Sequence, residues 1–558
     1  MKKQILLLCL ALISLCGYAQ QITVKGVVTS ATDQQPLIGT TVQVKGTGTG
    51  TITGIDGDYT LPNVDKNAVL VFSSIGFESQ EIAVGGRTTI NVVLKEAAEL
   101  LDEVVVIGYG AVKKSDLTSS IATVKGDEIT ETVTGNAMDA LQGKVNGVQV
   151  TSGGGPGATP KVLIRGVTTV NGTNPLYVVD GMPVGDNINF LNSNDIASME
   201  VLKDASAAAI YGTRASNGVI LITTKKGKTG KARINWNSSV GFQTVAKPNI
   251  AGAAEYKEVF NTRYTNDGLS SIWNDTGATT NPGGTDWWDT VVNKTALVQN
   301  HSLSVAGGSE QFVYNFSVGY YRNNSQFDVG YWDKINIRLN TEYTFNKYVK
   351  LGVDIAPRVE SWDDTPNQFS AAMAMDPTTP VFRPQDQWED NEYNNYQRSY
   401  NNQEWNPAGS IARSNAHSRE LGAILNTYLQ VTPIEKLTLR TQFGANAHYR
   451  RSDSFVPKFN MDPLEKQDLN TRRNQEWFDW NWTNTATYMD TFAEKHNLNV
   501  MAGFTAERFA WYNTQARRDN VPNNLDQMQE VNAGQQGTDE ANGETTYNTL
   551  VSFLGRVM

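Results

Sequence analysis

From about residue 230 onward, apolar and polar residues alternate with a period of two over long stretches of the chain. In residues 232–243 the apolar side chains share one face of a predicted strand, and these are Ile234, Trp236, Val240 and Phe242. The polar side chains share the other face, and these are Arg233, Asn235, Asn237 and Gln243. The alternation recurs at 312–320, 335–345, 349–355, 437–443, 478–488 and 498–504. Because successive side chains of a strand point to opposite faces, the pattern predicts strands with one apolar surface each.

The connections between these strands alternate in length. We expect short turns near 307–311, 346–348, 433–436 and 490–494. We expect mostly longer loops near 245–295, 325–332, 360–418, 450–475 and 510–544. A soluble sandwich also has period-two strands, but alternating short turns and long loops are typical of outer-membrane barrels, whose short turns lie in the periplasm. Residues 229–558 are therefore predicted to supply about ten strands of a transmembrane antiparallel β-barrel.

The final segment, YNTLVSFLGRVM, has the pattern of a strand without a closing hairpin. A barrel of about ten strands has a lumen too narrow to hold a domain of more than 100 residues, and outer-membrane barrels whose lumen holds such a domain use 22 strands. We therefore expect an N-terminal fragment with a partial barrel, which would reach 22 strands when complete. Such a partial barrel would have an unpaired strand edge, which lipid does not tolerate.

Residues 20–97 contain short β-rich runs separated by Gly, Pro and Asp, and this spacing predicts a small antiparallel β-sandwich. The run from Gly46 to Gly50 has the glycine content of a phosphate-binding loop, but strand residues follow it. A tight turn is the better interpretation, because a phosphate-binding loop leads into the N-terminus of a helix.

Residues 115–228 have a different pattern, which predicts a compact α+β domain. We expect a helical stretch at 138–144, strands at 147–151 and 161–165, and a hairpin at 175–184. The pair Asp180-Gly181 supplies the turn of that hairpin. A strand at 198–203, a short helix at 206–212 and a buried strand at 218–226 complete the prediction.

The N-terminus has the features of a secretion signal, with basic residues, an apolar run and small residues before position 20. We predict a signal peptide at 1–19 that is cleaved after Ala19. A lipid anchor at Cys16 is the weaker alternative, because Leu15 stands where a lipoprotein signal needs a small residue. Both cysteines, Cys9 and Cys16, lie in this signal, which excludes disulfides and thiolate metal sites from the mature chain. The mature chain has 45 basic and 57 acidic residues, a net charge of −12, which argues against a nucleic-acid partner.

Several long phrases of the sequence resemble one known family. The strings GVVTSATDQQPLIGTTVQVKGTGTGTITGIDGDYTL and FSSIGFESQEI resemble the carboxypeptidase regulatory-like domain, which is non-catalytic and precedes SusC/RagA-type transporters. The strings LQGKVNGVQVTSGGGPGATPKVLIRGV, PLYVVDGMPV and EVLKDASAAAIYGTRASNGVILITTKKG resemble the plug of that family, in the family's order. By this resemblance, the chain is identified as a member of the SusC/RagA family of TonB-dependent outer-membrane transporters.

Residues 98–114, between the sandwich and the plug, hold an apolar strand bounded by charge and glycine. From composition alone, this strand fits equally well as an internal strand of the next domain or as an exposed strand that pairs with the edge of a partner's sheet. The phrase DEVVVIGYG is similar to the TonB box of SusC-like proteins. The resemblance implies contact between TonB of the TonB-ExbB-ExbD complex and residues Asp102, Glu103, Val104, Val105, Val106, Ile107, Gly108, Tyr109 and Gly110.

Two further sets of residues are candidates for contacts. Charged residues of the plug are expected either to seat it in the barrel or to have ordinary surface roles, and these are Arg165, Asp180, Glu200, Lys203, Asp204 and Arg214. Loop tryptophans are expected either to contact a sugar or peptide or to anchor the barrel at the membrane interface, and these are Trp273, Trp287, Trp288, Trp362, Trp388 and Trp405.

The sequence gives little support to catalysis. His417 and Glu420 have the HxxE spacing of some zinc peptidases, with His448 or His496 as a possible third ligand. They lie where a long loop is expected to enter a strand, so their side chains need not converge. Neither a GxSxG serine motif nor a P-loop motif is present. We therefore predict no catalytic residue, no metal and no cofactor.

The resemblance implies TonB-dependent import of an oligosaccharide or a peptide across the outer membrane, together with a SusD-like surface lipoprotein. The barrel is expected to lie in outer-membrane lipid, with the sandwich and the plug facing the periplasm. The alternative is an adhesin or signalling receptor that uses the same barrel, and an outer-membrane hydrolase is a more distant third.

Overall fold

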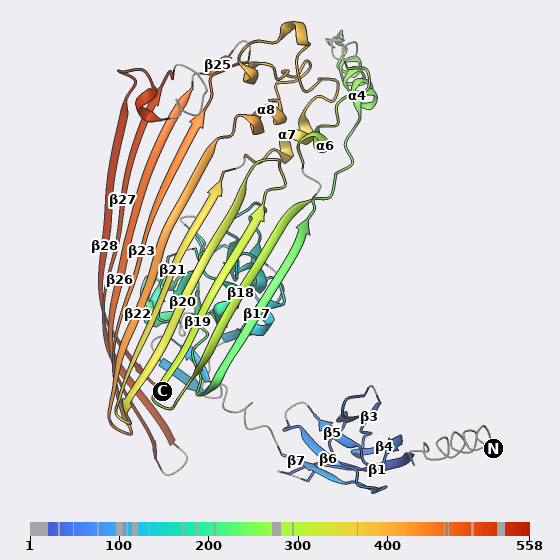
Figure 1. Cartoon of the computed structure of the whole chain (residues 1–558), viewed down its shortest axis with the longest axis vertical. Helices are drawn as coiled ribbons and strands as arrows, with labels where there is room; N and C mark the ends of the chain where they lie inside the picture. The colour runs from blue at the N-terminus through green and yellow to red at the C-terminus, as the bar shows by residue number, and fades with distance from the viewer. Residues whose placement is uncertain are drawn as a thin grey trace, which may run out of the picture. The chain divides into compact units, whose positions relative to one another are not determined.

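The computed structural model describes residues 21–31, 34–47, 49–74, 77–95, 104–107, 110–113, 121–132, 134–169, 172–185, 187–204, 208–270, 281–292, 295–364, 366–461, 464–466, 468–492, 496–521 and 530–558. They are mainly β, as the sequence predicts (Figure 1). They form two compact units, which divide between about residues 105 and 119. None of the helices in these ranges has the length and hydropathy needed to cross a membrane.

The N-terminal unit is a sandwich of two sheets with the strand orders β4-β1-β7 and β3-β2-β5-β6. Its strands are β1 (Gln21–Ser30), β2 (Thr41–Val44), β3 (Gly50–Ile52), β4 (Asp58–Asp65), β5 (Val69–Ser73), β6 (Gln80–Ala83) and β7 (Val92–Leu94). The prediction of antiparallel pairing holds for β1 with β4 and for β2 with β5. It is wrong for β7, which pairs with β1 in parallel.

The sandwich encloses an apolar core in which Leu70, Phe72 and Leu94 are fully buried. The run from Gly46 to Gly50 connects the paired strands β2 and β3, and Gly46 has a φ of 78°. The prediction of a turn at this run is therefore confirmed, because a positive φ is the conformation that glycine adopts at low cost.

The segment 121–224, which we call the plug, contains a five-stranded sheet with the order β10-β15-β16-β13-β14. Its strands are β10 (Ile121–Lys125), β13 (Leu176–Val179), β14 (Met182–Pro183), β15 (Ile196–Leu202) and β16 (Val219–Thr224). A separate hairpin joins β11 (Val148–Thr151) to β12 (Lys161–Ile164). The helical elements are α2 (Gly126–Thr130) and the 3-10 helices η3 (Asp139–Leu141), η4 (Ser193–Asp195) and η5 (Ala209–Ala215).

Both helices that the sequence predicts in the plug are shorter or displaced. The stretch expected at 138–144 contains only η3, and Gly143 at a φ of 74° interrupts helical geometry. Of the helix expected at 206–212, residues 206 and 207 lie outside the described residues, and residues 209–212 belong to η5, which is kinked at Gly212 with a φ of 64°. In both places, a glycine with a positive φ lies within the predicted range, and regular helical geometry does not continue through it.

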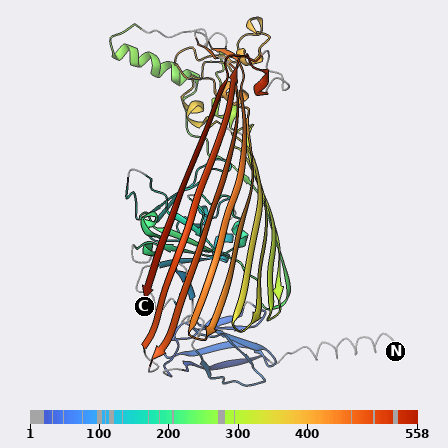
Figure 2. The ribbon, with the colours of Figure 1, turned by 90° about the vertical axis from the view of Figure 1, so that its left-hand side faces the viewer.

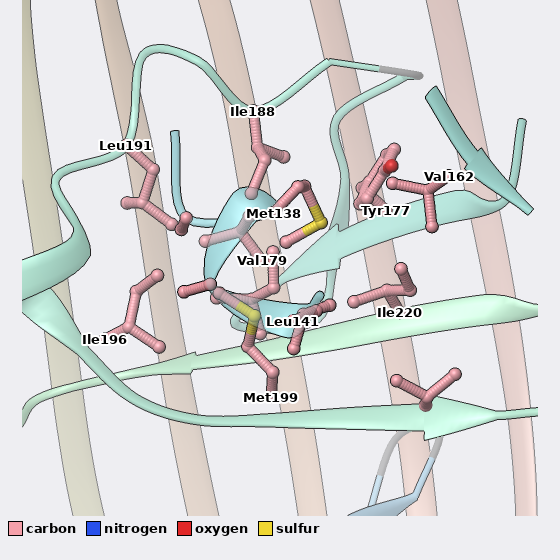
Figure 3. Packing of buried hydrophobic residues seen from close by; sticks show 14 of the residues in the cluster. Met138, Leu141, Val162, Tyr177, Val179, Ile188, Leu191, Ile196, Met199 and Ile220 are labelled. Atoms are coloured by element: carbon pink, nitrogen blue, oxygen red, sulfur yellow. The ribbon is translucent and has the colours of Figure 1, made fainter. Parts of the chain in front are cut away.

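The plug has a continuous apolar core between its sheet and its helical turns. In Figure 3, Met138 and Leu141 from the η3 region lie together with Val179, Met199 and Ile220 from three strands of the sheet. Each of these side chains is at most 2% exposed. The prediction of a compact α+β domain is therefore confirmed.

A sheet of ten antiparallel strands, which we call the long sheet, forms the remainder of this unit, with the order β17-β18-β19-β20-β21-β22-β23-β26-β27-β28. Figures 1 and 2 show these strands side by side, with the plug against one face. The strands are β17 (Gly230–Gln243), β18 (Ala296–Gly308), β19 (Phe312–Asn324), β20 (Tyr331–Asn346), β21 (Val349–Asp363), β22 (Ala416–Ile434), β23 (Leu437–Val456), β26 (Leu469–Phe492), β27 (His496–Asp519) and β28 (Glu540–Val557). The prediction of about ten strands is confirmed, whereas 22 strands in a complete barrel stay a prediction.

The long sheet exposes apolar side chains and buries polar ones. On β20 the outward residues are 39–46% exposed, and these are Ile335, Ile337 and Leu339. The inward residues are at most 9% exposed, and these are Lys334, Asn336, Arg338 and Asn340. This inside-out distribution is the one expected of strands that face lipid on one side and a polar lumen on the other.

The strands extend further toward the long loops than the apolar alternation indicates. Residues 450–456 and 469–475 were expected in a loop, yet they pair within β23 and β26. In the same way, β21 and β22 pair as far as Asp363 and His417. These extensions carry polar residues on both faces, so their sequence does not alternate between apolar and polar residues. They remain part of the sheet because their main-chain hydrogen bonds continue.

The long loops contain elements that the alternation does not predict. They are the helices α4 (Ala253–Asn266), α6 (Trp287–Val291), α7 (Phe369–Ala374) and α8 (Pro407–Ala412), the 3-10 helices η6 (Gln385–Gln387), η7 (Glu392–Asn394) and η9 (Val531–Ala533), and the hairpin of β24 (Phe459–Met461) and β25 (Leu464–Lys466). Parts of α6, α7 and α8 pack around an apolar cluster with Phe327 and Met375. The loops of β17–β18, β19–β20 and β21–β22 therefore share one small core.

Candidate functional site

The tip of the β13–β14 hairpin is held by the long sheet. Asp180 and Gly181 form its two-residue turn with φ values of 47° and 87°, the geometry that an Asp-Gly pair favours in a type I′ turn. The carbonyl oxygen of Asp180 accepts hydrogen bonds from Asn426 Nδ2 on β22 at 2.7 Å and from Gln442 Nε2 on β23 at 2.8 Å. The turn predicted from the sequence is therefore also a point of contact between plug and sheet.

The carboxylate of Asp180 belongs to a buried ionic cluster. Its Oδ2 lies 2.8 Å from Arg338 Nη2 on β20, and the same nitrogen lies 2.9 Å from Asp354 Oδ2 on β21. Asp180 also accepts hydrogen bonds from the amide and the hydroxyl of Thr224. Removal of one member would leave another charge buried without compensation, which is costly in a protein interior.

A second ionic contact joins the plug to β27. Arg214 Nη1 lies 2.8 Å from Glu507 Oε2, and Arg214 Nη2 donates to Glu507 Oε1 at 3.0 Å. The guanidinium also lies over the ring of Phe509, 5.4 Å from its centroid. Two parallel hydrogen bonds of this kind fix both the position and the orientation of the guanidinium.

Other polar side chains of β20 bind the main chain of the plug. Lys334 Nζ donates to three carbonyl oxygens at 2.5–3.2 Å, and these belong to Asn189, Gly135 and Leu191. Asn336 Nδ2 donates to the carbonyl of Phe190. Lys334 and Asn336 were not candidates from the sequence, although Asn336 lies on the polar face of the alternation at 335–345 and Lys334 directly precedes that range.

The plug and the sheet approach each other closely at glycines. A Cβ atom on Gly227, in the connection from the plug to β17, would lie 2.4 Å from the backbone nitrogen of Tyr314, and one on Gly319 of β19 would lie 1.9 Å from Asn192 Nδ2 of the plug. Neither position has space for a side chain without movement of its neighbour. Both glycines therefore allow a fit that larger residues would disturb.

Asp195 of η4 is buried in the plug, with 5% of its surface exposed. Burial raises the pKa of its carboxyl group, and the positive charges of Arg338, Lys225 and Lys334 oppose that shift. The contact between plug and sheet thus includes a carboxyl group whose environment favours the neutral form.

A cavity of about 470 Å³ lies between the plug and the part of the long sheet nearer the long loops. The plug contributes residues that follow β11 and β14, and these are Pro156, Gly157, Ala158, Val184, Gly185, Asn187, Asn189 and Phe190. Residues of β20 to β23 and β26, with Asp364, form the other side, and these are Trp332, Arg358, Glu360, Trp362, Asp364, Glu420, Asn446, His448, Arg450, Trp477 and Asp479. A ligand in this cavity would therefore contact both parts of the molecule.

The wall of the cavity combines ionic and aromatic groups. The buried carboxylate of Glu420 accepts hydrogen bonds from Arg358 and Arg450, and its Oε1 lies 2.8 Å from His448 Nδ1. The guanidinium of Arg450 lies over the rings of both Trp362 and Trp477, at 5.1 and 5.2 Å from their centroids. Such stacked and hydrogen-bonded side chains are held in fixed positions, which suits recognition of a polar ligand.

Comparison with known proteins places two family models on this chain in order. The CarboxypepD_reg-like domain matches residues 24–106, and the TonB-dependent Receptor Plug Domain matches residues 113–219. The chain is also 38% identical over 393 residues to the TonB-dependent receptor SusC of Bacteroides thetaiotaomicron, across 68% of this chain and 38% of SusC. The chain belongs to the SusC/RagA-like TonB-dependent receptors.

Two further relatives support the family and bound the comparison. The TonB-dependent receptor P39 of Formosa agariphila is 30% identical over 538 residues, which are 94% of this chain and 50% of P39. A solved structure of the RagAB peptide importer superposes with a TM-score of 0.69 at 26% identity, over 82% of this chain and 54% of that one. This receptor chain therefore spans about half or less of the length of these curated relatives.

Within this receptor, the remaining charged candidates of the plug contact other plug residues. Arg165 Nη2 lies 2.5 Å from Asp204 Oδ1, and Lys203 Nζ donates to the carbonyl of Asn146 at 3.0 Å. Glu200 is buried in β15, between β10 and β16. Among the described contacts of the six candidates, the side chains of Asp180 and Arg214 reach the long sheet. A role of either residue in seating the plug stays a proposal.

The tryptophans of this receptor have different surroundings. Trp287 and Trp288 are 3% and 6% exposed in the apolar cluster of the loops, which leaves little of either ring for a ligand and favours a packing role. Trp388 and Trp405 are partly exposed in loops, while Trp362 lies on β21 in the cavity wall. Trp273 lies outside the described residues. The tryptophans Trp332 and Trp477 of the cavity were missed, because polar strand extensions surround them in the sequence.

The residues of the HxxE spacing lie at the start of a strand, where a long loop enters it, as the sequence predicts. His417 and Glu420 both belong to β22, three positions apart, so their side chains point to opposite faces of the sheet. His417 Nδ1 lies 2.7 Å from Asp363 Oδ1, whereas Glu420 faces His448. In the part of the chain that the structure covers, no three His, Cys, Asp or Glu side chains are grouped for metal binding.

The segment predicted as a TonB box is only partly described. Residues Val104–Ile107 form β8, which pairs with β9 (Gly110–Lys113) in a two-stranded sheet. Asp102, Glu103, Gly108 and Tyr109 lie outside the described residues. Contact of this segment with TonB therefore stays a prediction.

Proposed function

We propose that this receptor imports a nutrient, an oligosaccharide or a peptide, across the outer membrane with energy supplied through TonB. The observation that carries the proposal is the shared cavity, because a ligand there would contact Asn189 and Phe190 of the plug as well as Arg358 of the sheet. Binding and plug position are therefore linked by direct contact. The inside-out strands of the long sheet support a location in lipid.

The chemistry of the cavity supports a polar ligand with hydroxyl or amide groups. Arg450 and Glu420 offer charged hydrogen-bonding groups, and Trp332, Trp362 and Trp477 offer aromatic surface. Both an oligosaccharide and a peptide present such groups. The similarity to the RagAB peptide importer supports a transported ligand, and a SusD-like lipoprotein above the long loops belongs to the same proposal by family resemblance.

The chain order supports transmission of force from residues 102–110. This segment precedes β10, which is an edge strand of the plug sheet and pairs only with β15 in that sheet. A pull from the N-terminal side would reach β10 before the inner strands. An edge strand has one neighbour to separate from, so it is the part of a sheet that opens most easily.

The test measures growth of the native host on candidate oligosaccharides and peptides as sole nutrients. One strain carries the unchanged protein, and one carries a Gly/Ser segment of equal length in place of residues 102–110. A control strain carries Glu96→Ser and Glu99→Ser, which alter the neighbouring charges and retain residues 102–110. Surface abundance is first shown to be equal in all strains.

We expect that only the strain in which residues 102–110 are replaced loses growth on one class of nutrient. That class would be the substrate class. Unchanged growth and uptake on every candidate would refute import. The adhesin or signalling receptor would then be the better interpretation, since either can keep ligand binding without TonB-driven transport.

A further inference from the structure

The ammonium group of Lys334 is buried at the contact between plug and sheet, with 2% of the residue exposed. Its three hydrogen-bond donors match the three carbonyl oxygens of the plug that accept from it. The rings of Trp332 and Tyr321 lie beside it, at 4.9 and 5.8 Å from Nζ to the ring centroids. All three donors of the lysine are therefore engaged by the plug.

The three carbonyls come from two parts of the plug that are distant in sequence. Gly135 follows β10 and α2, whereas Asn189 and Leu191 follow the β13–β14 hairpin. The side chain of Asn136 also donates to that of Asn189, so the two parts meet at this point. A Cβ atom on Gly135 would lie 2.4 Å from the ring of Tyr321, which shows how closely β19 confines this segment.

The same lysine adjoins the cavity. Asn189 and Trp332 line the cavity and contact Lys334, and Trp332 Nε1 donates to Glu360 Oε2 at 3.2 Å. Glu360 is a further lining residue of the cavity, so the ring of Trp332 connects it to Lys334. A change in the cavity wall therefore acts on the immediate neighbours of Lys334.

We propose that Lys334 is a positioning residue that fastens plug segment 134–141 and the 189–191 loop to the long sheet, and that this contact stops a pull on β10 from extending into the remainder of the plug. The first part follows from the contacts alone. The second part rests on the proposed TonB-driven import, because it needs a force that enters from residues 102–110.

The first experiment measures hydrogen exchange by mass spectrometry in the purified full-length protein. Lys334→Met keeps the aliphatic stem and removes the donors and the charge. Lys350→Met is the matched control, because Lys350 lies on β21, is half exposed and pairs with Glu342 of the same sheet. We expect Lys334→Met to accelerate exchange in peptides of 121–141 and 187–191 by at least about tenfold, because all three hydrogen bonds that Lys334 donates are lost.

Peptides of β12 and β16 should keep their exchange rates within about twofold, because they lie outside the fastened segments. Gly135→Ala is a second variant that disturbs the same contact without a change of charge, and it should accelerate the same peptides. Unchanged exchange at 121–141 in both variants, or uniform acceleration over the whole plug, would overturn the positioning role.

The second experiment tests the pull with vancomycin, a hydrophilic antibiotic too large to cross an intact outer membrane. Native-host cells that produce Lys334→Met should become more sensitive than cells with Lys350→Met, and the sensitivity should require residues 102–110. If Lys334→Met cells were equally sensitive to vancomycin with and without residues 102–110, the proposed limit on the pull would be wrong, and so would the proposal that TonB supplies the force. The exchange result would still decide the first part on its own.

Discussion

The interior of the plug is built from apolar side chains, whereas the surface that meets the long sheet is built from charged groups, amides and main-chain carbonyls. Met199 and Leu141 in the interior are fully buried among aliphatic neighbours. Among the described residues of the long sheet, Ile424 of β22 is the one that belongs to this buried cluster. At that surface, Asp180 and Arg214 of the plug form ion pairs with the long sheet, and Lys334 of β20 donates hydrogen bonds to the plug. The plug is therefore held together and held in place by different interactions.

This difference has a consequence for movement of the plug. Apolar burial is non-directional and is lost only when the core opens to water. Hydrogen bonds and ion pairs at the contact can be replaced by water, so each contributes a modest net free energy and the contact can open without loss of the core. A plug of this construction can leave its place, in whole or in part, before it unfolds.

The largest effect is expected from Arg338→Met, which removes the positive charge between Asp180 and Asp354. Two buried carboxylates then lose their counter-ion, and the contact should be destabilised by about 3–5 kcal/mol. The measurement is hydrogen exchange at the β13–β14 hairpin in the purified protein. A double-mutant cycle with Asp180→Asn is the control, and strictly additive effects would contradict direct coupling between the two residues.

A similar or slightly smaller effect is expected from Leu141→Ala in the fully buried interior of the plug. Loss of a buried leucine side chain typically costs about 2–5 kcal/mol, including the cavity that remains. In contrast to Arg338→Met, this change should accelerate exchange throughout β13, β15 and β16. The effect should not be confined to the plug residues that contact β20. If Leu141→Ala loosened only the hairpin tip, the separation between core and contact would be wrong.

The two sides of this contact were not equally predictable from the sequence. Asp180 was a candidate because it is a charged residue of the plug, and the Asp-Gly pair separately predicts the turn in which it lies. Lys334 was not a candidate, since its partners are carbonyl oxygens 143–199 residues away and a carbonyl has no signature in the sequence. Strand alternation gives the direction of a side chain but does not identify what it meets.

The cavity was missed for a related reason. Glu420 and His448 were considered as possible zinc ligands, and the structure brings these two side chains together on neighbouring strands, with Arg450 beside them. The spacing within β22 could not show this, because the contact crosses from β22 to β23. The apolar alternation ends before these polar strand extensions, so their pairing depends on main-chain register that only the structure reveals.

A change with opposite sign is expected from Asp195→Asn. Burial raises the pKa of Asp195 above its value in the unfolded chain, so its contribution to stability is complete below the unfolded pKa and is lost as pH rises through the folded pKa. At neutral pH the amide should therefore stabilise the plug relative to the carboxylate. The measurement is the exchange-derived opening free energy of β16 between pH 5 and 8 for both proteins. Lower stability of Asp195→Asn at every pH would show instead that Asp195 acts mainly as a counter-ion to Arg338 and Lys334.

The smallest effect is expected from Asp204→Asn, which provides a matched contrast to Asp180. Both aspartates are plug residues that pair with an arginine, but Arg165 beside Asp204 is more than half exposed, whereas Arg338 beside Asp180 is 3% exposed. Water screens the exposed pair, so its loss should cost less than about 1 kcal/mol. Exchange at the β13–β14 hairpin should then match that of the unchanged protein. If Asp204→Asn destabilised the plug as much as Arg338→Met, burial would not distinguish the ion pairs that hold the plug in place from those that contribute little.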